Sequence, residues 1–185
     1  MPVVNAINAE ADRIGGEAGW IGPRITPPGV ENDCRGDRGG KWVQFTNAQF
    51  YWTAITGAKA IPNNLMEPYG QFDYEVGFLG YPIGDHTVLT GPDGQPWGDV
   101  QGFERGTLYR RYGQPGFYVH GYIGALWFRS GFENGPFGWP TSLEETLPNG
   151  DIVQHFEKGD IVYSVTGTIG LRPLDGPDEI VQVQH

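Results

Sequence analysis

Two stretches of the chain carry apolar residues at helical spacing. In residues 7–14 and again in residues 65–72, apolar side chains occupy positions i, i+4 and i+7, which predicts one buried face of a short helix in each stretch. Pro68 lies inside the second pattern, so that helix is short or begins there. Asparagines close to these stretches are the expected N-caps, namely Asn5, and Asn63 or Asn64.

Alternating apolar and polar residues on either side of short polar turns predict three β-hairpins. The expected turns are at residues 47–48, 105–106 and 158–159, and strand-like residues precede and follow each of them. Near the C-terminus, residues 179–183 alternate in the same way and predict an extra strand.

These elements recur with a fixed spacing. A glycine turn of the form Gly-x-apolar-Gly occurs at residues 19–22, 77–80 and 135–138, and its last glycines are 58 residues apart. Phe45 and Phe103, one in each of the first two hairpins, are also 58 residues apart, whereas Phe156 of the third hairpin comes five residues early. The sequence therefore predicts three copies of a unit made of a short helix, a glycine turn, a polar loop and a hairpin.

One copy is too small to bury its apolar side alone, so neighbouring copies are expected to share a core. The predicted fold class is α+β, mostly β, with three pseudo-symmetric repeats in a compact propeller-like or rosette-like array. We expect a single repeat domain over residues 1–185. Its predicted repeats cover residues 5–60, 61–118 and 119–170, followed by a C-terminal tail over residues 171–185.

Composition narrows the range of partners. The 185 residues include 30 Gly, 15 Pro and 14% aromatic residues, which suits short strands joined by tight turns. The formal net charge of −10 disfavours nucleic acids and anionic lipid surfaces as partners. Cys34 is the one cysteine, so the chain forms no internal disulfide. Residues 1–5 show no signal-peptide features, and no apolar run approaches the length of a membrane span.

The repeated motifs resemble a known family. Phe78-Leu79-Gly80-Tyr81-Pro82 followed by Phe103-Glu104-Arg105-Gly106 is similar to the LGFP repeat. Residues 137–141 with 156–159 look like another copy, and residues 20–23 with 45–48 look like a degenerate one. The resemblance covers roughly residues 5 to 170.

The resemblance implies non-catalytic binding to cell-wall polysaccharide of the arabinogalactan type in mycolate-containing actinobacteria. The implied location is extracellular, on the cell-envelope surface or in a virion. The alternative is a bacteriophage virion protein, structural or used for host attachment, that carries the same repeats and contacts virion proteins or further copies of itself.

Sugar binding requires flat aromatic faces with polar groups around them, and an aromatic contact contributes about 0.5–1.5 kcal/mol beyond the burial of area. Phe45, Phe103 and Phe156 are always phenylalanine, and Tyr51, Tyr109 and Tyr163 are always tyrosine, so these positions are predicted to belong to the core. The remaining aromatic residues vary between copies or have no counterpart. The predicted ligand-binding residues are Tyr81, Trp97, Trp139, Trp52 and Arg110.

An enzyme is not expected. The adjacent acids Glu144 and Glu145 would point to opposite faces of a strand, and Asp85-His86 lies at a position that recurs with the repeat. The four histidines lack the spacing of metal ligands. We therefore predict no catalytic residue, no metal site and no cofactor.

Overall fold

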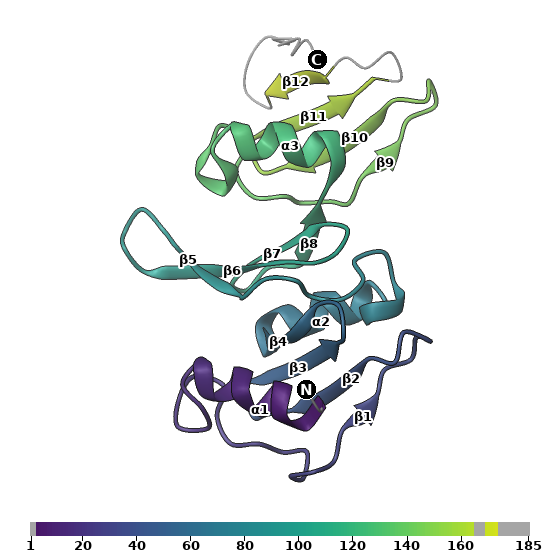
Figure 1. Ribbon diagram of the computed structural model, residues 1–185. Coiled ribbons are helices and arrows are strands. Elements are labelled where there is room, and N and C mark those ends of the chain that lie inside the picture. The colour runs from purple at the N-terminus through teal and green to yellow at the C-terminus, as the bar shows by residue number, and fades with distance from the viewer. Residues whose placement is uncertain (1–2, 165–168, 174–185) are drawn as a thin grey trace. The chain divides into compact units, whose positions relative to one another are not determined.

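The computed structural model describes residues 3–164 and 169–173 (Figure 1). Within these residues the chain forms three helices and three small antiparallel sheets, which confirms the predicted mostly-β α+β class. The chain divides into two compact units, Met1–Tyr112 and Gly113–His185, which are described separately below. The arrangement of the repeats as a propeller or rosette stays a prediction, and the expected strand at 179–183 lies outside the described residues.

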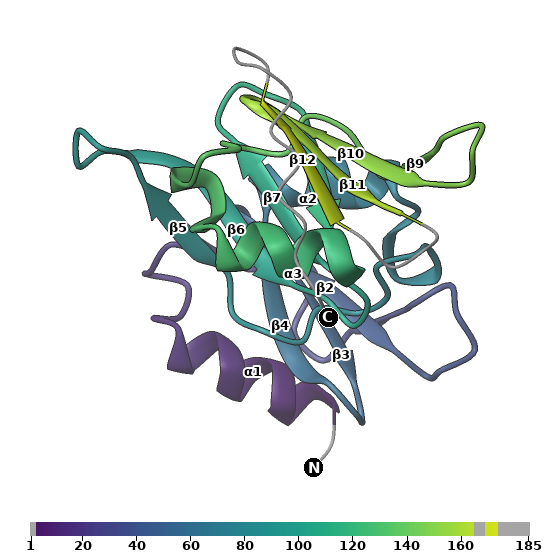
Figure 2. The same cartoon turned by 90° about the horizontal axis from the view of Figure 1, so that it is seen from above.

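The first unit begins with helix α1 (Val3–Arg13) and a four-stranded sheet. The strands are β1 (Asn32–Asp33), β2 (Lys41–Gln44), β3 (Ala48–Thr53) and β4 (Gly57–Pro62), and they pair in that order. Helix α1 lies against β3 and β4 (Figure 2). Its predicted apolar face packs into a core with residues of β2 and β3, such as Val43 and Phe50.

The second helix of this unit is shared between two sheets. Helix α2 (Asn63–Gln71) contacts β3 and β4 as well as β6 (Pro96–Gly102) and β7 (Thr107–Arg111). Strand β5 (Thr87–Thr90) pairs with β6, and a 3₁₀ helix η1 (Tyr74–Val76) follows α2. Because α2 buries side chains toward both sheets, the two copies in this unit share a core, as the sequence predicts.

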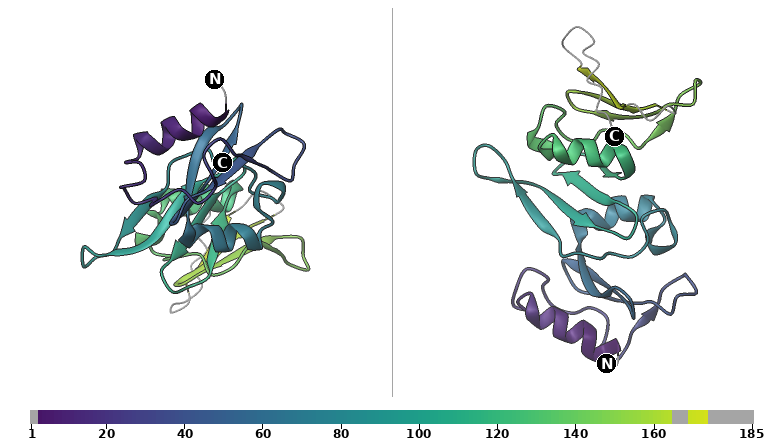
Figure 3. Two further views of the ribbon diagram at one scale, coloured as in Figure 1. Left: turned by 90° about the horizontal axis from the view of Figure 1, so that it is seen from below. Right: turned by 45° about the horizontal axis from the view of Figure 1, so that its top comes forward.

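The second unit repeats the same order of elements. Strand β8 (Gly116–Val119) leads into α3 (Gly121–Arg129) and η2 (Phe132–Asn134). The third sheet has the order β12-β11-β10-β9, from β9 (Glu145–Thr146), β10 (Ile152–Phe156), β11 (Gly159–Tyr163) and β12 (Ile169–Pro173). Helix α3 packs on β11 (Figure 3, right).

The glycine turns have the same local geometry in all three copies. The φ angles of Gly22, Gly80 and Gly138 are 70°, 71° and 70°, in the left-handed region that glycine adopts without strain. The tip of the following hairpin holds each turn. In the second copy, the Glu104 N–H donates to the Tyr81 carbonyl (3.0 Å) and the Arg105 N–H donates to the Leu79 carbonyl (3.2 Å). The equivalent pairs are Thr46–Pro23 and Asn47–Ile21, and Glu157–Trp139 and Lys158–Phe137.

Side chains complete this clamp in the second and third copies. Oε2 of Glu104 also accepts a bond from the Tyr81 N–H (3.1 Å). From the helix side, the Tyr69 hydroxyl donates to the Gly80 carbonyl (2.9 Å), and Trp127 Nε1 donates to the Gly138 carbonyl (3.0 Å). Buried carbonyl groups are thereby satisfied. The first copy has Ala11 at the position of Tyr69 and lacks this bond.

A buried glutamine ties each later copy to the strand that precedes it. Gln101 Nε2 donates to the carbonyls of Ala60 in β4 (2.9 Å) and Gly84 (3.0 Å). Gln154 makes the same two bonds, to Tyr118 in β8 and to Ser142 (both 2.9 Å). The described part of the first copy has no preceding strand to hold, and it carries Val43 two residues before its buried phenylalanine.

The core predictions are confirmed except at Tyr163, and the cap predictions are wrong. The three repeated phenylalanines are buried, as are Tyr51 and Tyr109, whereas Tyr163 is half-buried. Asn5 lies inside α1, and the N-cap of α2 is Pro62. The asparagine side chains are used elsewhere: Asn63 Nδ2 donates to the Thr46 carbonyl (2.9 Å), and Asn64 Nδ2 to Asp99 (2.7 Å).

Alanine in place of three glycines tests the turn geometry. Gly80 has a left-handed φ, and a Cβ added there would also clash with the Glu104 carboxylate. Gly94 has a left-handed φ but open space around it, and Gly84 has neither a left-handed φ nor a close neighbour. A left-handed alanine costs about 1–2 kcal/mol. In urea unfolding, Gly80→Ala should therefore lower the free energy of unfolding most, Gly94→Ala by about that cost, and Gly84→Ala least. Equal losses for Gly80→Ala and Gly84→Ala would contradict the clamp.

Candidate ligand cavities

A cavity of about 460 Å³ lies beside the start of α2, between elements of the first two copies. This volume falls in the range of roughly 300–1,000 Å³ typical of small-molecule sites. We call it the α2 cavity. The lining residues used below are Trp20, Asn63, Asn64, His86, Asp99 and Tyr112.

Asp99 provides the polar floor of the α2 cavity. Strand β6 places it where only 4% of the residue is exposed. Its Oδ2 accepts a hydrogen bond from Asn64 Nδ2 (2.7 Å), and its Oδ1 lies 3.2 Å from Nε2 of His86. Burial, followed by the nearby Asp99 charge, raises the pKa of Tyr112, which keeps that phenol neutral. The floor is therefore a carboxylate held by an amide and an imidazole.

Two exposed aromatic side chains form the walls. Trp20 is 38% exposed and Tyr112 is 42% exposed. The Trp20 ring lies 4.7 Å from the His86 ring, tilted by 53°. Asn47 Nδ2 donates to the Trp20 carbonyl (2.9 Å), which holds the backbone of the glycine turn in place. Aromatic faces and polar groups thus converge on one space before any ligand is bound.

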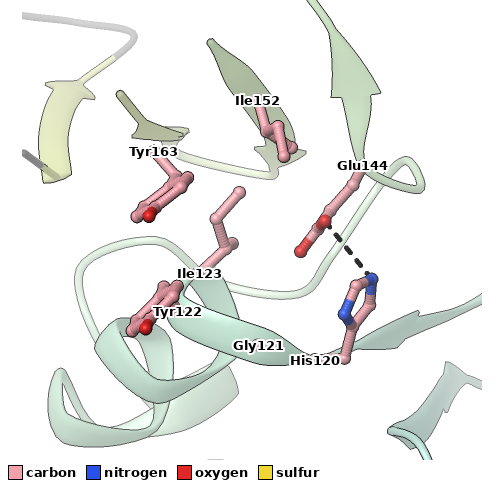
Figure 4. A pocket seen from close by; sticks show the side chains of 7 residues that line it. All are labelled: His120, Gly121, Tyr122, Ile123, Glu144, Ile152 and Tyr163. Atoms are coloured by element: carbon pink, nitrogen blue, oxygen red, sulfur yellow. Dashed lines mark ion pairs between the residues drawn. The ribbon is translucent and has the colours of Figure 1, made fainter. Parts of the chain in front are cut away.

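A smaller cavity of about 190 Å³ lies beside α3 in the second unit (Figure 4). We call it the α3 cavity. The Tyr122 and Tyr163 rings stack at one end, 4.9 Å apart and nearly parallel, with Ile123 and Ile152 in the middle. At the other end, His120 Nε2 lies 3.3 Å from Glu144 Oε2.

The polar pair of the α3 cavity is partly desolvated. Burial raises the pKa of the Glu144 carboxyl, and burial lowers the pKa of the His120 imidazole. Both shifts favour the uncharged form of the side chain. An ion pair at this distance would shift both pKa values the other way, so desolvation dominates here.

The structure buries two of the five predicted ligand-binding residues. Tyr81 is 1% exposed and Trp139 is 3% exposed, so neither offers a face to a ligand. The Tyr81 hydroxyl occupies the space that a side chain at Gly40 would need, and Arg38 lies over its ring at 4.9 Å. The change from Tyr81 to Trp139 between copies predicts ligand contact, and this prediction is wrong because both residues are packed in the interior.

The other two aromatic candidates are half-buried. Trp52 packs against the core of the first copy. Trp97 lies in β6 with the Arg111 guanidinium over its ring at 5.3 Å. Neither residue lines the α2 cavity or the α3 cavity.

Arg110 compensates for the proline inside α2. Pro68 has no N–H to donate to the carbonyl of Asn64, four residues earlier in the helix. Arg110 Nη1 donates to that carbonyl instead (2.8 Å), and its Nη2 pairs with Glu67 (2.7 Å). Arg110, which was predicted to bind ligand, therefore has a structural role: it lies in β7 and stabilises α2.

The sequence did not predict that the residues lining the two cavities would come together. Trp20 is not among the five predicted ligand-binding residues, and in the sequence His86 is considered as a catalytic or metal-binding residue rather than as part of a ligand cavity. One signal was present: residues 62–64 and 120–122 are 58 apart, and so are His86 and Glu144. In each case the first member lines the α2 cavity and the second member lines the α3 cavity, at the same place in the repeat.

The recurrence of helix, glycine turn and clamped hairpin defines a tandem-repeat protein. The family model of the LGFP repeat matches residues 27–77 and 79–135, more than half of the chain. The chain therefore belongs to the LGFP repeat family, with two copies matched; the third predicted copy lies largely beyond residue 135. This membership is consistent with a cell-envelope-associated repeat protein. No curated protein matches the chain.

None of the helices in the described residues is long and apolar enough to cross a bilayer.

A double-mutant cycle tests the role of Arg110. Arg110→Met leaves a carbonyl without its partner and should lower the free energy of unfolding by about 1–3 kcal/mol. Pro68→Ala restores an N–H that can donate to Asn64, so Arg110→Met should cost less in that background. Denaturant unfolding of the four proteins measures the coupling. Purely additive losses would show that Arg110 does not replace the missing bond.

Glu144→Gln should make the protein more stable than the parent at high pH, and this difference should disappear at low pH. The folded-state pKa of Glu144 is raised, so its favourable contribution is complete below its unfolded pKa and is lost as the pH rises through the folded value. Glutamine carries no charge to bury. Thermal unfolding should give a higher Tm for the variant at pH 8 and similar Tm values at pH 4. A Tm for the variant at pH 8 equal to or below that of the parent would contradict this account.

Proposed function

We propose that the chain is a non-catalytic binding protein for envelope polysaccharide of the arabinogalactan type and that the α2 cavity is its main site. The α2 cavity carries this proposal, because it combines an exposed Trp20 with a hydrogen-bonding floor at Asp99. A sugar ring presents C–H groups on its faces and hydroxyls at its edge. This cavity supplies an aromatic wall for the faces and polar groups for the hydroxyls.

Charge disfavours an anionic ligand and leaves uncharged and cationic ligands open. The formal net charge is −10, and the carboxylate at the floor adds local negative potential, so phosphate-rich or carboxylate-rich polymers would be repelled. Neutral hydroxyls can donate to Asp99 and can accept bonds from amide groups. Asn63 and Asn64 bring amides to the same cavity.

Substitution of the tryptophan tests this function. Trp20→Ala removes one aromatic contact worth about 0.5–1.5 kcal/mol, which corresponds to a loss of about twofold to tenfold in affinity. The measurement is retention on purified mycolyl-arabinogalactan-peptidoglycan over a range of protein concentrations.

The matched control is Phe78→Ala. Phe78 occupies the same place in the second glycine turn, is similarly exposed, and lies outside both cavities. It should bind as the parent does. Absence of retention of the parent protein, or equal retention of Trp20→Ala and the parent, would overturn the proposal.

A further inference from the structure

The α2 and α3 cavities are built from the same places in the repeat. Pro62, Asn63 and Asn64 line the first, and the residues 58 positions later, His120, Gly121 and Tyr122, line the second. His86 and Glu144, also 58 apart, each place a polar side chain at the wall. The chemistry of the two cavities therefore differs while their construction is shared.

The size of the α3 cavity limits its occupant. A volume of about 190 Å³ holds roughly six water molecules at about 30 Å³ each. This space suits one ring of a ligand, while the rest of a polymer would extend outside it. The α2 cavity, at about 460 Å³, has room for more than one ring.

The lining of the α3 cavity limits the chemistry of that ring. Ile123 and Ile152 provide an apolar middle, and Tyr122, which is 56% exposed, places an aromatic ring at the entrance. The lining as a whole is almost entirely apolar, and Glu144, with His120 beside it at 3.3 Å, adds a small polar edge at the opposite end. A ring with a broad apolar face and a hydroxyl at one edge matches this order of groups (Figure 4).

We propose that the α3 cavity is a second binding site, selective for a single uncharged sugar ring, and that the chain holds its polymer at two points. The choice of a sugar as the ligand rests on the proposed function, whereas the preference for a small neutral ring rests on the cavity itself. Burial disfavours the charged forms of Glu144 and His120, which agrees with an uncharged ligand. Two linked sites gain affinity for a polymer through effective concentration.

Isoleucine methyl NMR tests the site directly. Methyl arabinoside and methyl galactoside serve as single-ring probes, and glucuronate serves as the charged control. At least one neutral probe should shift the methyl signals of Ile123 and Ile152 saturably, while the exposed Ile55, outside both cavities, should not respond. Glucuronate should leave all three signals in place. If neither neutral probe shifts Ile123 or Ile152, the proposal is overturned.

Variants separate this inference from the proposed function. Tyr122→Ala and Glu144→Leu should abolish the shifts at Ile123 and Ile152 and weaken retention on the wall polymer by about tenfold or more. Trp20→Ala should keep the shifts. Phe132→Ala, an exposed aromatic residue of the same unit outside the cavity, should behave as the parent does.

Each result on the polymer has a separate meaning. If the polymer retains Tyr122→Ala and Glu144→Leu as strongly as the parent while it retains Trp20→Ala more weakly, the proposed function stands and the second site is overturned. If the polymer does not retain the parent but a neutral probe shifts Ile123 and Ile152, the second site stands and the proposed function fails.

Discussion

The contact between each hairpin tip and its glycine turn organises the rest of the structure. Two backbone N–H groups at the tip of the hairpin donate to two carbonyls of the turn, and this pattern occurs at Gly22, Gly80 and Gly138. The turn can approach so closely because its last residue has a left-handed φ and no Cβ. Once the hairpin holds the turn, the sheet, the helix and the loop between them are fixed relative to one another.

The same clamp explains where the cavities lie. Trp20 follows the first glycine of its turn, and Asn47 at the hairpin tip holds the Trp20 carbonyl. Helix α2 begins directly after β4, so Asn63 and Asn64 reach the side of that turn and meet His86 and Asp99 from the next copy. The site therefore depends on contacts within a copy and on contacts between the two copies of the first unit.

The local elements could be predicted from the sequence because their signals are local. The 58-residue spacing identified the glycine turns, and the constant Phe45, Phe103 and Phe156 identified the core. The motif of a phenylalanine followed by Glu104 and Arg105 was recognised as a pattern, and the structure supplies its reason, since these residues bind the glycine turn.

The residues that line the cavities could not be predicted in the same way, because their exposure depends on packing between copies. Tyr81 varies between copies and yet is buried beside Gly40, which lies in the preceding copy. Arg110 was predicted to bind ligand, but Pro68 in α2 lacks the N–H that would pair with the Asn64 carbonyl, and Arg110 donates to that carbonyl instead. Trp20 has no constant counterpart in the other copies, and only the fold places it beside His86 and Asp99 in one cavity.

A crystal structure of the chain with a short arabinogalactan oligosaccharide would test the central claim most directly. The account predicts electron density for sugar rings in the α2 cavity, with one ring against Trp20 and hydroxyls within hydrogen-bond distance of Asp99. Sugar bound only at other surfaces, with the α2 cavity left to water at saturating ligand, would contradict it.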